Sequence, residues 1–399
     1  MLFPLEDKRI ILGVSGSVAC YKALDLASCL TQEKALVDVI LTASAMQFVK
    51  PLGFRSLTHR DVVTDMFDLS SEFAVEHVSL AERADIIVVA PATANVIAKI
   101  ALGLSDDHLT GTILASQAPI IVAPAMDAHM YTNPVTQQNL EILRERRVTI
   151  LGPAEGRLAS GLVGAGRLVE THQLVGKIKY VLGQDGDFKG RRVIVSAGGT
   201  SESIDPVREI TNRSSGKMGY ALAEAARDRG AETVLVTASK QLVDPVDVEI
   251  VRVQTSSEMH EAIQKNVSNE TDALIMAAAV SDYKPKTVSA NKVKKGKAGW
   301  EISLESTIDI LETIEMNAGV KVGFAAESTS IIQNALSKVR QKKLDLIVAN
   351  DISSPQSGFG SDTNKVWIID RGEKVEELPV LPKYEVANRI LDRTAQLFK

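Results

Sequence analysis

Cysteine is scarce in this sequence of 399 residues, and no long apolar segment is present. Cys20 and Cys29 are the only thiols, which excludes a disulfide framework and a cysteine-rich zinc site. No run approaches the roughly 18 apolar residues of a membrane-spanning helix, and the N-terminus (MLFPLEDKR) lacks the apolar core of a signal peptide. We therefore expect a cytoplasmic protein with no membrane partner.

A strong charge of one sign and a P-loop are also missing. The formal net charge of -5 offers no basic surface, so nucleic acid is not an expected partner. Hydrophobic and charged fractions of 45% and 24% are ordinary for a soluble globular chain. This length predicts two or three domains, each large enough to have its own core.

A β-rich segment followed by glycine and then a helix occurs twice. The first copy spans residues 8–22, where strand 9–14 precedes Ser15-Gly16-Ser17. In the second copy, strand 191–196 precedes Gly198-Gly199, and a helix begins near Lys217. Such turns present backbone N–H groups to phosphate. The repeat predicts two tandem Rossmann-like α/β domains, with the linker-like segment 183–190 between them.

In the N-terminal half, apolar strands end repeatedly in small or hydroxylated residues; the strands are 9–14, 36–41, 85–90 and 119–123. Such strands are typical of a buried parallel sheet, whose ligands lie at its carboxyl edge. An incomplete GxGxxG and the lack of an acidic residue after the second strand disfavour NAD. Ser17, Thr42 and Ser44 suit the phosphate of a mononucleotide such as FMN. The alternative is that these loops are only tight turns.

One histidine and two loop segments can each be interpreted either as functional or as merely structural. His77 lies beside the expected crevice, where an imidazole could move protons, although a lone histidine is often structural. The glycine-rich residues 153–170 form either a flap over that crevice or an inert connector. The lysine-rich residues 284–299 are either a solvated loop or a loop that closes over a triphosphate.

Motifs in both halves resemble one family. GVSGSVACYK, PATAN, PAMDAHMY and GRLASGLVGAGRL look like the flavin-dependent cysteine decarboxylase domain. SAGGT, DPVREITNRSSGKMG, MAAAVSDY, NKVKK, GFAAE and VANDI look like phosphopantothenate–cysteine ligase. Together they are similar to the bifunctional coenzyme A biosynthesis proteins of bacteria. The resemblance implies a flavodoxin-like FMN-dependent decarboxylase domain at 1–183 and a nucleotide-binding, CTP-dependent ligase domain at 190–399.

The resemblance implies that the ligase domain activates 4'-phosphopantothenate with CTP and Mg²⁺ as an acyl-cytidylate, which cysteine then converts to the amide. Asn212 would stabilise charge at the acyl centre, and Arg208 would support that step. Lys292 and Lys294 would neutralise the triphosphate. Asp282 would either contact the ribose or have a metal-linked role, and Phe324 would line the nucleotide site. The resemblance leaves the identity of the metal ligands open.

The decarboxylase domain would convert 4'-phosphopantothenoylcysteine to 4'-phosphopantetheine, with His77 at its active site. The expected flavin contacts are Gly16, Ser17, Thr42, Ser44, Thr93 and Asn95. Two catalytic positions depart from the family pattern. Asp127 replaces an asparagine that holds the substrate carboxylate, and an ionised aspartate would repel that group. Ser160 replaces a proton-donating cysteine, and its hydroxyl is a far weaker acid.

We expect both activities, and the resemblance implies a homo-oligomer. Trimeric decarboxylase domains and dimeric ligase domains would combine into a dodecamer. One alternative is a ligase whose flavin domain serves only as a trimerising scaffold or regulatory module. A regulatory flavoprotein and an NAD(P)-dependent flavin reductase are further alternatives, but neither explains Asn212 and the lysine-rich loop.

Overall fold

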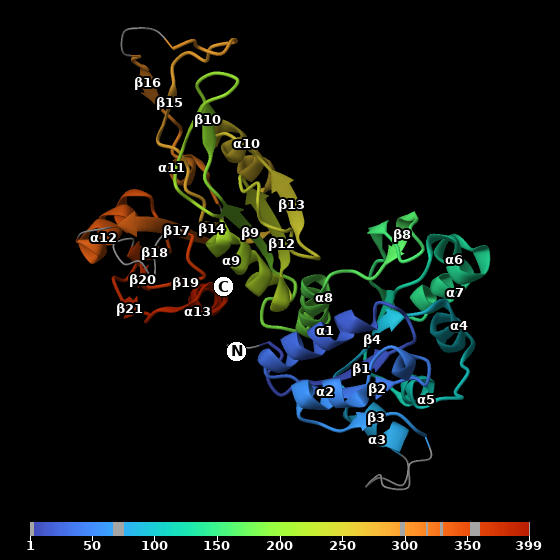
Figure 1. The fold of residues 1–399 in the computed structure, drawn as a ribbon. Coiled ribbons are helices and arrows are strands. Elements are labelled where there is room, and N and C mark those ends of the chain that lie inside the picture. Colours follow the sequence, from blue (N-terminus) through green and yellow to red (C-terminus); the bar gives the residue numbers. More distant parts are fainter. Residues whose placement is uncertain are drawn as a thin grey trace. The chain divides into compact units, whose positions relative to one another are not determined.

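The computed structural model describes residues 4–66, 76–295, 300–316, 318–327, 330–351 and 360–398. The chain divides into two compact units, Phe3–Leu182 and Gly183–Lys399 (Figure 1). No helix within the described ranges is both long and apolar enough to span a bilayer. Each unit contains a parallel or mostly parallel sheet covered by helices, which confirms the prediction of two tandem Rossmann-like α/β domains.

The N-terminal sheet has the strand order β3-β2-β1-β4-β5-β6, and all its pairs are parallel. Its strands are β1 (Arg9–Val14), β2 (Leu36–Leu41), β3 (Val62–Val63), β4 (Ile86–Ala92), β5 (Ile120–Pro124) and β6 (Thr149–Ile150). The chain reverses its direction of travel across the sheet between β1 and β4. Ligands of open α/β sheets bind at this switch point.

Helices cover both faces of this sheet. One face packs against α1 (Cys20–Gln32), α2 (Pro51–Thr58) and α8 (Thr171–Gly183). The other packs against α3 (Glu76–Arg83), α4 (Ala94–Leu102), α5 (His108–Ala115) and α7 (Pro134–Glu145). The remaining short helices are η1 (Ala45–Gln47) and α6 (Ala128–Thr132). The buried side chains of α1 recur at helical spacing, because a helix can bury only one stripe against a sheet.

The glycine-rich segment 153–170 contains an antiparallel hairpin. Its strands are β7 (Ala154–Arg157) and β8 (Val163–Arg167). Met126 N–H donates to Gly166 O at 3.0 Å, which fixes β8 beside the loop that follows β5. A Cβ on Gly166 would lie 2.3 Å from Met126 O, so this close approach requires glycine.

The C-terminal sheet has the order β13-β12-β9-β14-β17-β18-β20-β21, with β20 and β21 antiparallel to their neighbours. The strands are β9 (Arg192–Ala197), β12 (Glu232–Thr237), β13 (Glu249–Arg252), β14 (Thr271–Met276), β17 (Val320–Glu327), β18 (Leu346–Asp351), β20 (Val366–Asp370) and β21 (Val375–Glu377). The switch point lies between β9 and β14. The first six strands therefore repeat the order of the N-terminal sheet.

Helices α9 (Lys217–Asp228) and α13 (Lys383–Ala395) pack on one face of this sheet, and α10 (Ser256–Asn266) and α11 (Ile310–Thr313) pack on the other. Helix α12 (Ile331–Gln341) covers the sheet near β18, and β19 (Thr363–Asn364) pairs with β22 (Leu381–Pro382). Gly219 allows α9 to lie close to β9, because a Cβ there would be 2.5 Å from that of Ala197.

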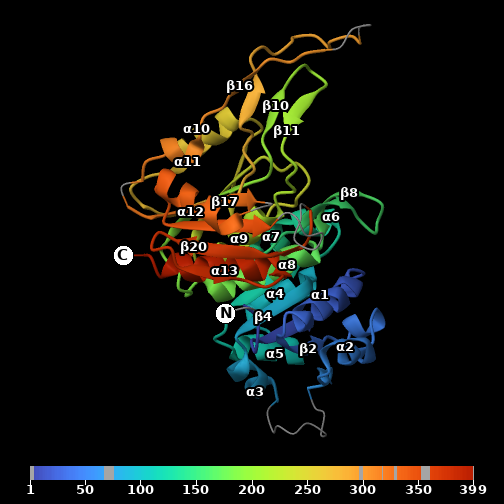
Figure 2. The ribbon, with the colours of Figure 1, turned by 90° about the vertical axis from the view of Figure 1, so that its left-hand side faces the viewer.

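Two thin ribbons project together from the C-terminal unit (Figures 1 and 2). One pairs β10 (Ser201–Ser203) with β11 (Glu209–Thr211), and the other pairs β15 (Tyr283–Pro285) with β16 (Leu304–Ser306). Ser289 N–H donates to Ile204 O at 3.0 Å and joins the two ribbons. We call the described part of residues 201–211 and 283–306 the arm.

The predicted linker, residues 183–190, packs against the end of α9. Phe188 is fully buried in the C-terminal core, and its N–H donates to Arg229 O at 3.0 Å. Asp187 forms an ion pair with Arg229 at 2.5 Å. The compact C-terminal unit thus includes residues before 190.

Candidate active sites

The loops after β1 and β4 are tied together at the switch point of the N-terminal sheet. Ser15 is fully buried, and its hydroxyl donates to Pro91 O at 2.8 Å. The same hydroxyl accepts a hydrogen bond from Thr93 N–H at 2.9 Å. These bonds fix the two loops between which a ligand of this sheet would lie.

The residues predicted to contact a flavin follow the ends of β1, β2 and β4. Gly16 packs against the loop after β2, where a Cβ would lie 2.4 Å from Ser44 Cβ. Ser17 accepts from Ala19 N–H before α1, Thr42 accepts from Ala45 N–H, and Thr93 caps α4. Ser44 and Asn95 are exposed. Small residues, hydroxyls and helix N-termini at one sheet edge fit the phosphate and polar ring edge of a flavin.

His77 lies in the first turn of α3 and packs on α5. Its ring meets that of His108 edge to face, with 5.9 Å between the centroids. In both Figure 1 and Figure 2, α3 lies at one end of the N-terminal unit, and α6 with β8 lies at the other. The structure therefore separates His77 from the other predicted catalytic residues of this half.

Asp127 and Ser160 contact each other directly. Ser160 lies in the turn of the β7–β8 hairpin, and its hydroxyl donates to Asp127 Oδ2 at 2.6 Å. Asp127 also caps α6 by accepting from His129 N–H at 3.0 Å. The Ser160 hydrogen bond, followed by that from His129, lowers the pKa of the Asp127 carboxyl. Asp127 is therefore ionised at neutral pH and held by the hairpin.

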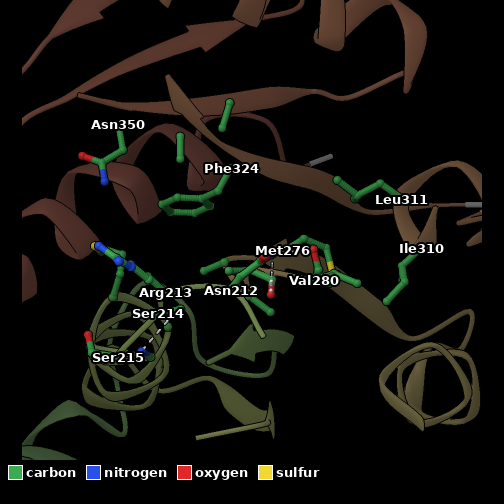
Figure 3. A pocket seen from close by; sticks show the side chains of 18 of the residues that line it. Asn212, Arg213, Ser214, Ser215, Met276, Val280, Ile310, Leu311, Phe324 and Asn350 are labelled. Carbon is green, nitrogen blue, oxygen red and sulfur yellow. Dashed lines mark hydrogen bonds between the residues drawn. The ribbon is translucent and has the colours of Figure 1, made fainter. Parts of the chain in front are cut away.

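A cavity of about 710 Å³ opens at the carboxyl edge of the C-terminal sheet (Figure 3). Its walls come from the loop before α9, the ends of β14, β17 and β18, the segment before α11, and the start of α13. Among the predicted ligase residues, three line it: Asn212, Asp282 and Phe324. The cavity lies at the switch point, where a nucleotide is expected.

The Asn212 side chain is held by the loop that follows β14, next to the switch point of the sheet. Its amide donates to Val280 O at 2.9 Å and to Ala279 O at 3.4 Å. Gly199 allows this approach, because a Cβ there would lie 2.7 Å from Asn212 O. The asparagine therefore connects the loop before α9 to the loop that follows β14, and Figure 3 shows it beside Val280.

The other predicted ligase residues lie on the arm. Arg208 donates to Val293 O at 3.1 Å, and its guanidinium is 4.9 Å from the ring centroid of Trp300. Burial by itself would raise the pKa of the Asp205 carboxyl. The carboxyl accepts hydrogen bonds from the N–H groups of Val207, Val293 and Arg208, and it also pairs with the Arg208 charge. These interactions outweigh burial, so the pKa of Asp205 is below its ordinary value. Lys292 and Lys294 flank Val293 and are exposed. None of these residues lines the cavity of the same chain.

Both halves of the chain match known families. The Flavoprotein family matches residues 4–183, and the DNA/pantothenate metabolism flavoprotein C-terminal domain matches residues 188–398. The coenzyme A biosynthesis bifunctional protein CoaBC of Bacillus subtilis (strain 168) is 43% identical over 400 residues, which cover 99% of this chain and 98% of that protein. This chain belongs to the CoaBC family.

Two solved structures are also similar. The crystal structure of a CoaBC C-terminal domain is 39% identical and covers 53% of this chain and 97% of its own, with a TM-score of 0.45. The FMN-dependent cysteine decarboxylase SpaF is 33% identical and covers 41% of this chain and 91% of its own, with a TM-score of 0.37.

Sequence reasoning missed much of the cavity lining of this CoaBC family member. The polar residues involved are Lys217, Lys338, Lys342, Asn350, Asn364 and Lys383. Lys338 and Lys342 are four residues apart on and just after α12, a spacing that places them on one side. This spacing of two lysines is the feature of the sequence that could have indicated a cationic wall of the cavity. Among the described residues, no group of three His, Cys, Asp or Glu side chains could hold a metal ion.

Proposed function

We propose that this chain catalyses two consecutive steps of coenzyme A biosynthesis in the cytoplasm. The C-terminal half joins 4'-phosphopantothenate to cysteine with CTP, and the N-terminal half decarboxylates the product to 4'-phosphopantetheine. The match to a CoaBC protein over 99% of the chain supports both activities. The observation that carries the ligase assignment is Asn212, held at the switch point in a cavity large enough for a nucleotide.

In the ligase step, a carboxylate must first be converted to a better electrophile. Attack on CTP would give an acyl-cytidylate and pyrophosphate, and the amine of cysteine would then displace CMP. The Asn212 amide could donate to the acyl oxygen as negative charge develops there. Phe324 offers an apolar face to the base. Mg²⁺ would enter with the triphosphate, since this ion usually binds through substrate phosphates and a few carboxylates.

In the decarboxylase step, bound FMN would supply two-electron oxidation and reduction at the cysteine carbon–sulfur unit. Gly16 keeps the loops after β1 and β2 close, and Ser17, Thr42 and Thr93 would face the flavin phosphate. The His77 imidazole would accept or return a proton of the substrate thiol. The hairpin carrying Ser160 would cover the substrate.

The positions of the site residues support a homo-oligomer. His77 and the Asp127–Ser160 pair lie at opposite ends of one N-terminal unit (Figures 1 and 2), so a site that uses both needs two chains. This arrangement favours a trimer of the N-terminal decarboxylase domains. Exposed Val207, Val288 and Trp300 on the arm favour a ligase dimer. Combining these symmetries would give a dodecamer, and a monomer in light scattering would contradict this proposal.

Mass spectrometry of the products tests both assignments. Purified protein with 4'-phosphopantothenate, cysteine and CTP should release pyrophosphate, and without that release the ligase assignment fails. With 4'-phosphopantothenoylcysteine it should form 4'-phosphopantetheine. Unchanged substrate with FMN bound would instead support a ligase whose flavin domain is a scaffold, an alternative that the ionised Asp127 motivates.

A further inference from the structure

The base of the β7–β8 hairpin is attached to α1 by a lysine that neither proposed reaction uses. Lys22 lies in the first turn of α1, and its side chain is only 11% exposed. Its Nζ donates to Leu168 O at 3.2 Å and to Glu170 Oε2 at 3.0 Å. Both acceptors lie between β8 and α8, where the chain returns from the hairpin. Lys22 therefore connects the first helix of the unit to the end of the hairpin segment.

The position of this ammonium group is unfavourable for α1 itself. The N-terminus of a helix carries a partial positive charge, which repels a cation in the first turn. Burial of most of the side chain also removes the charge from water, and this is costly unless the charge is paired. The first turn of α1 contains no acidic residue that could compensate. The carbonyl and the carboxylate after β8 supply the compensation, so the lysine serves a tertiary contact and not the helix.

Glu170 joins three elements at this point. Besides accepting from Lys22 of α1, its carboxylate forms an ion pair with Arg167 at the end of β8. Its N–H donates to Gln173 Oε1 of α8 at 3.1 Å. The hydrogen bond from Lys22, followed by the charges of Lys22 and Arg167, lowers the pKa of the Glu170 carboxyl. The carboxylate is therefore ionised at neutral pH and pairs with a fully charged lysine.

The two contacts of the hairpin with the rest of the unit lie at opposite ends of it. At the base, the two ends of the segment meet, since a Cβ on Gly152 would lie 2.5 Å from Val169 Cγ1. At the turn, residues 159–163 are exposed, and Ser160 donates to Asp127. The Lys22–Glu170 pair holds the base, and the Ser160–Asp127 pair holds the turn.

We propose that Lys22, acting through Glu170, is a positioning residue that holds the β7–β8 hairpin in place over the substrate of the decarboxylase. Helix α1 begins shortly after Ser17, a predicted flavin contact. The ion pair thus fixes the hairpin to the helix whose N-terminus would face the flavin phosphate. The inference rests on the proposed decarboxylase function and adds the pair of residues that sets the position of the hairpin.

This role predicts a separation between binding and turnover. A hairpin without its anchor at the base would occupy the covering position for only part of the time. The apparent affinity of a ligand falls by the fraction of the protein that is competent to bind it, whereas saturating substrate restores the competent form. Loss of the anchor should therefore raise KM and leave kcat unchanged. A purely structural ion pair would lower the unfolding temperature without this separation.

Steady-state decarboxylation of 4'-phosphopantothenoylcysteine by the full chain tests the role. Lys22→Met keeps an unbranched side chain at the buried position and removes the ammonium group. We expect KM to rise about fivefold with kcat and bound flavin unchanged, because only the competent fraction of the hairpin falls. Glu170→Gln, at a half-exposed position, should also raise KM. The double variant should be no worse than Lys22→Met alone, because the two residues act as a unit.

Hydrogen exchange gives a second readout that does not depend on turnover. The Met126 N–H donates to Gly166 O, so its protection reports contact between the hairpin and the loop after β5. We expect this amide to lose protection at pH 7 in Lys22→Met. Lys50→Met makes the same substitution at an exposed lysine of the same unit, and this control should behave like the wild type.

The outcomes separate this inference from the decarboxylase assignment. If the wild type forms 4'-phosphopantetheine and both single variants keep its KM and its Met126 protection, the assignment stands and the positioning role is wrong. A lower unfolding temperature with an unchanged KM would identify a structural ion pair and would also overturn the role. If the wild type binds FMN but forms no product, the assignment and the positioning role fail together.

Discussion

The Ser160 hydroxyl donates to Asp127 Oδ2 at 2.6 Å and connects the turn of the β7–β8 hairpin to the start of α6. The two positions that the resemblance marks as departures from the family pattern are therefore hydrogen-bonded partners. A thiol and an amide at these positions would make a weaker contact than a hydroxyl and a carboxylate. The two replacements thus act together to hold the hairpin.

The hairpin contact should depend on pH. The pKa of Asp127 is lower in the folded protein than in the unfolded chain, so the contact is present above the ordinary carboxyl pKa of about 4 and is lost as pH falls through the lowered pKa. We expect amide hydrogens of residues 158–166 to lose protection between pH 7 and pH 3, after correction for intrinsic exchange. Ser160→Ala should show low protection at both pH values. Equal protection in the variant and the wild type would contradict this role.

Removing the charge of Asp127 should improve binding of a substrate that carries a carboxylate. In Asp127→Asn we expect KM for 4'-phosphopantothenoylcysteine to fall by about fivefold, because two like charges in contact repel each other even in water. Decarboxylation kinetics measure the change, and CTP-dependent ligation by the same sample is the internal control. An unchanged KM would place the substrate carboxylate away from Asp127.

Asn212→Ala should abolish most ligase turnover. If the amide stabilises the developing charge at the acyl centre, kcat should fall by about 10²–10³. Release of pyrophosphate and of the final amide should be followed separately, because they report the two half-reactions. Gln264→Ala, on the exposed face of α10, is an amide control that should behave like wild type. A change confined to KM would assign Asn212 to binding alone.

The buried cluster that joins α9 to α13 should contribute to the stability of the C-terminal domain. Tyr384 donates to Asp228 Oδ2 at 2.7 Å, and Arg227 binds the other carboxylate oxygen. Tyr384→Phe should lower the free energy of unfolding by about 1.5–3 kcal/mol, the usual contribution of a hydrogen bond to a charged group. Urea unfolding followed by tryptophan fluorescence suits this test, because both tryptophans lie in this domain. Tyr283→Phe, on the exposed arm, should have little effect.

Local patterns in the sequence predicted the elements that position both sites. Strands β1 and β2 were predicted residue for residue, and α9 was predicted to begin near Lys217, where it does begin. Apolar runs that stop at glycine or hydroxylated residues are strong local signals. The β7–β8 hairpin was not predicted. Its short strands are glycine-rich and half exposed, so neither apolar alternation nor strand propensity marks them.

The groupings of side chains could not be predicted in the same way. Asp127 and Ser160 are 33 residues apart, and the hairpin geometry that joins them leaves no pattern in either segment. Lys217, Asn364 and Lys383 come from α9, β19 and α13, which only the finished sheet brings to one cavity. Arg208 and Lys294 were predicted to act in the same reaction as Asn212, but within one chain they lie on the arm, where a contact with Trp300 holds the arginine.

The packing of residues 183–190 decides where a gene for this protein could be divided. Gly183 and Gly186 lie so close to the end of α9 that a Cβ on either would be within 2.3 Å of the carbonyl oxygen of Asp228 or Arg229. Phe188 fills the core behind them. A break after codon 190 would leave Phe188 on the upstream polypeptide. That polypeptide would then end in an exposed apolar segment, and the core of the downstream polypeptide would contain a cavity where the phenyl ring belongs. Fission of the gene into two working cistrons therefore requires a cut upstream of Gly183.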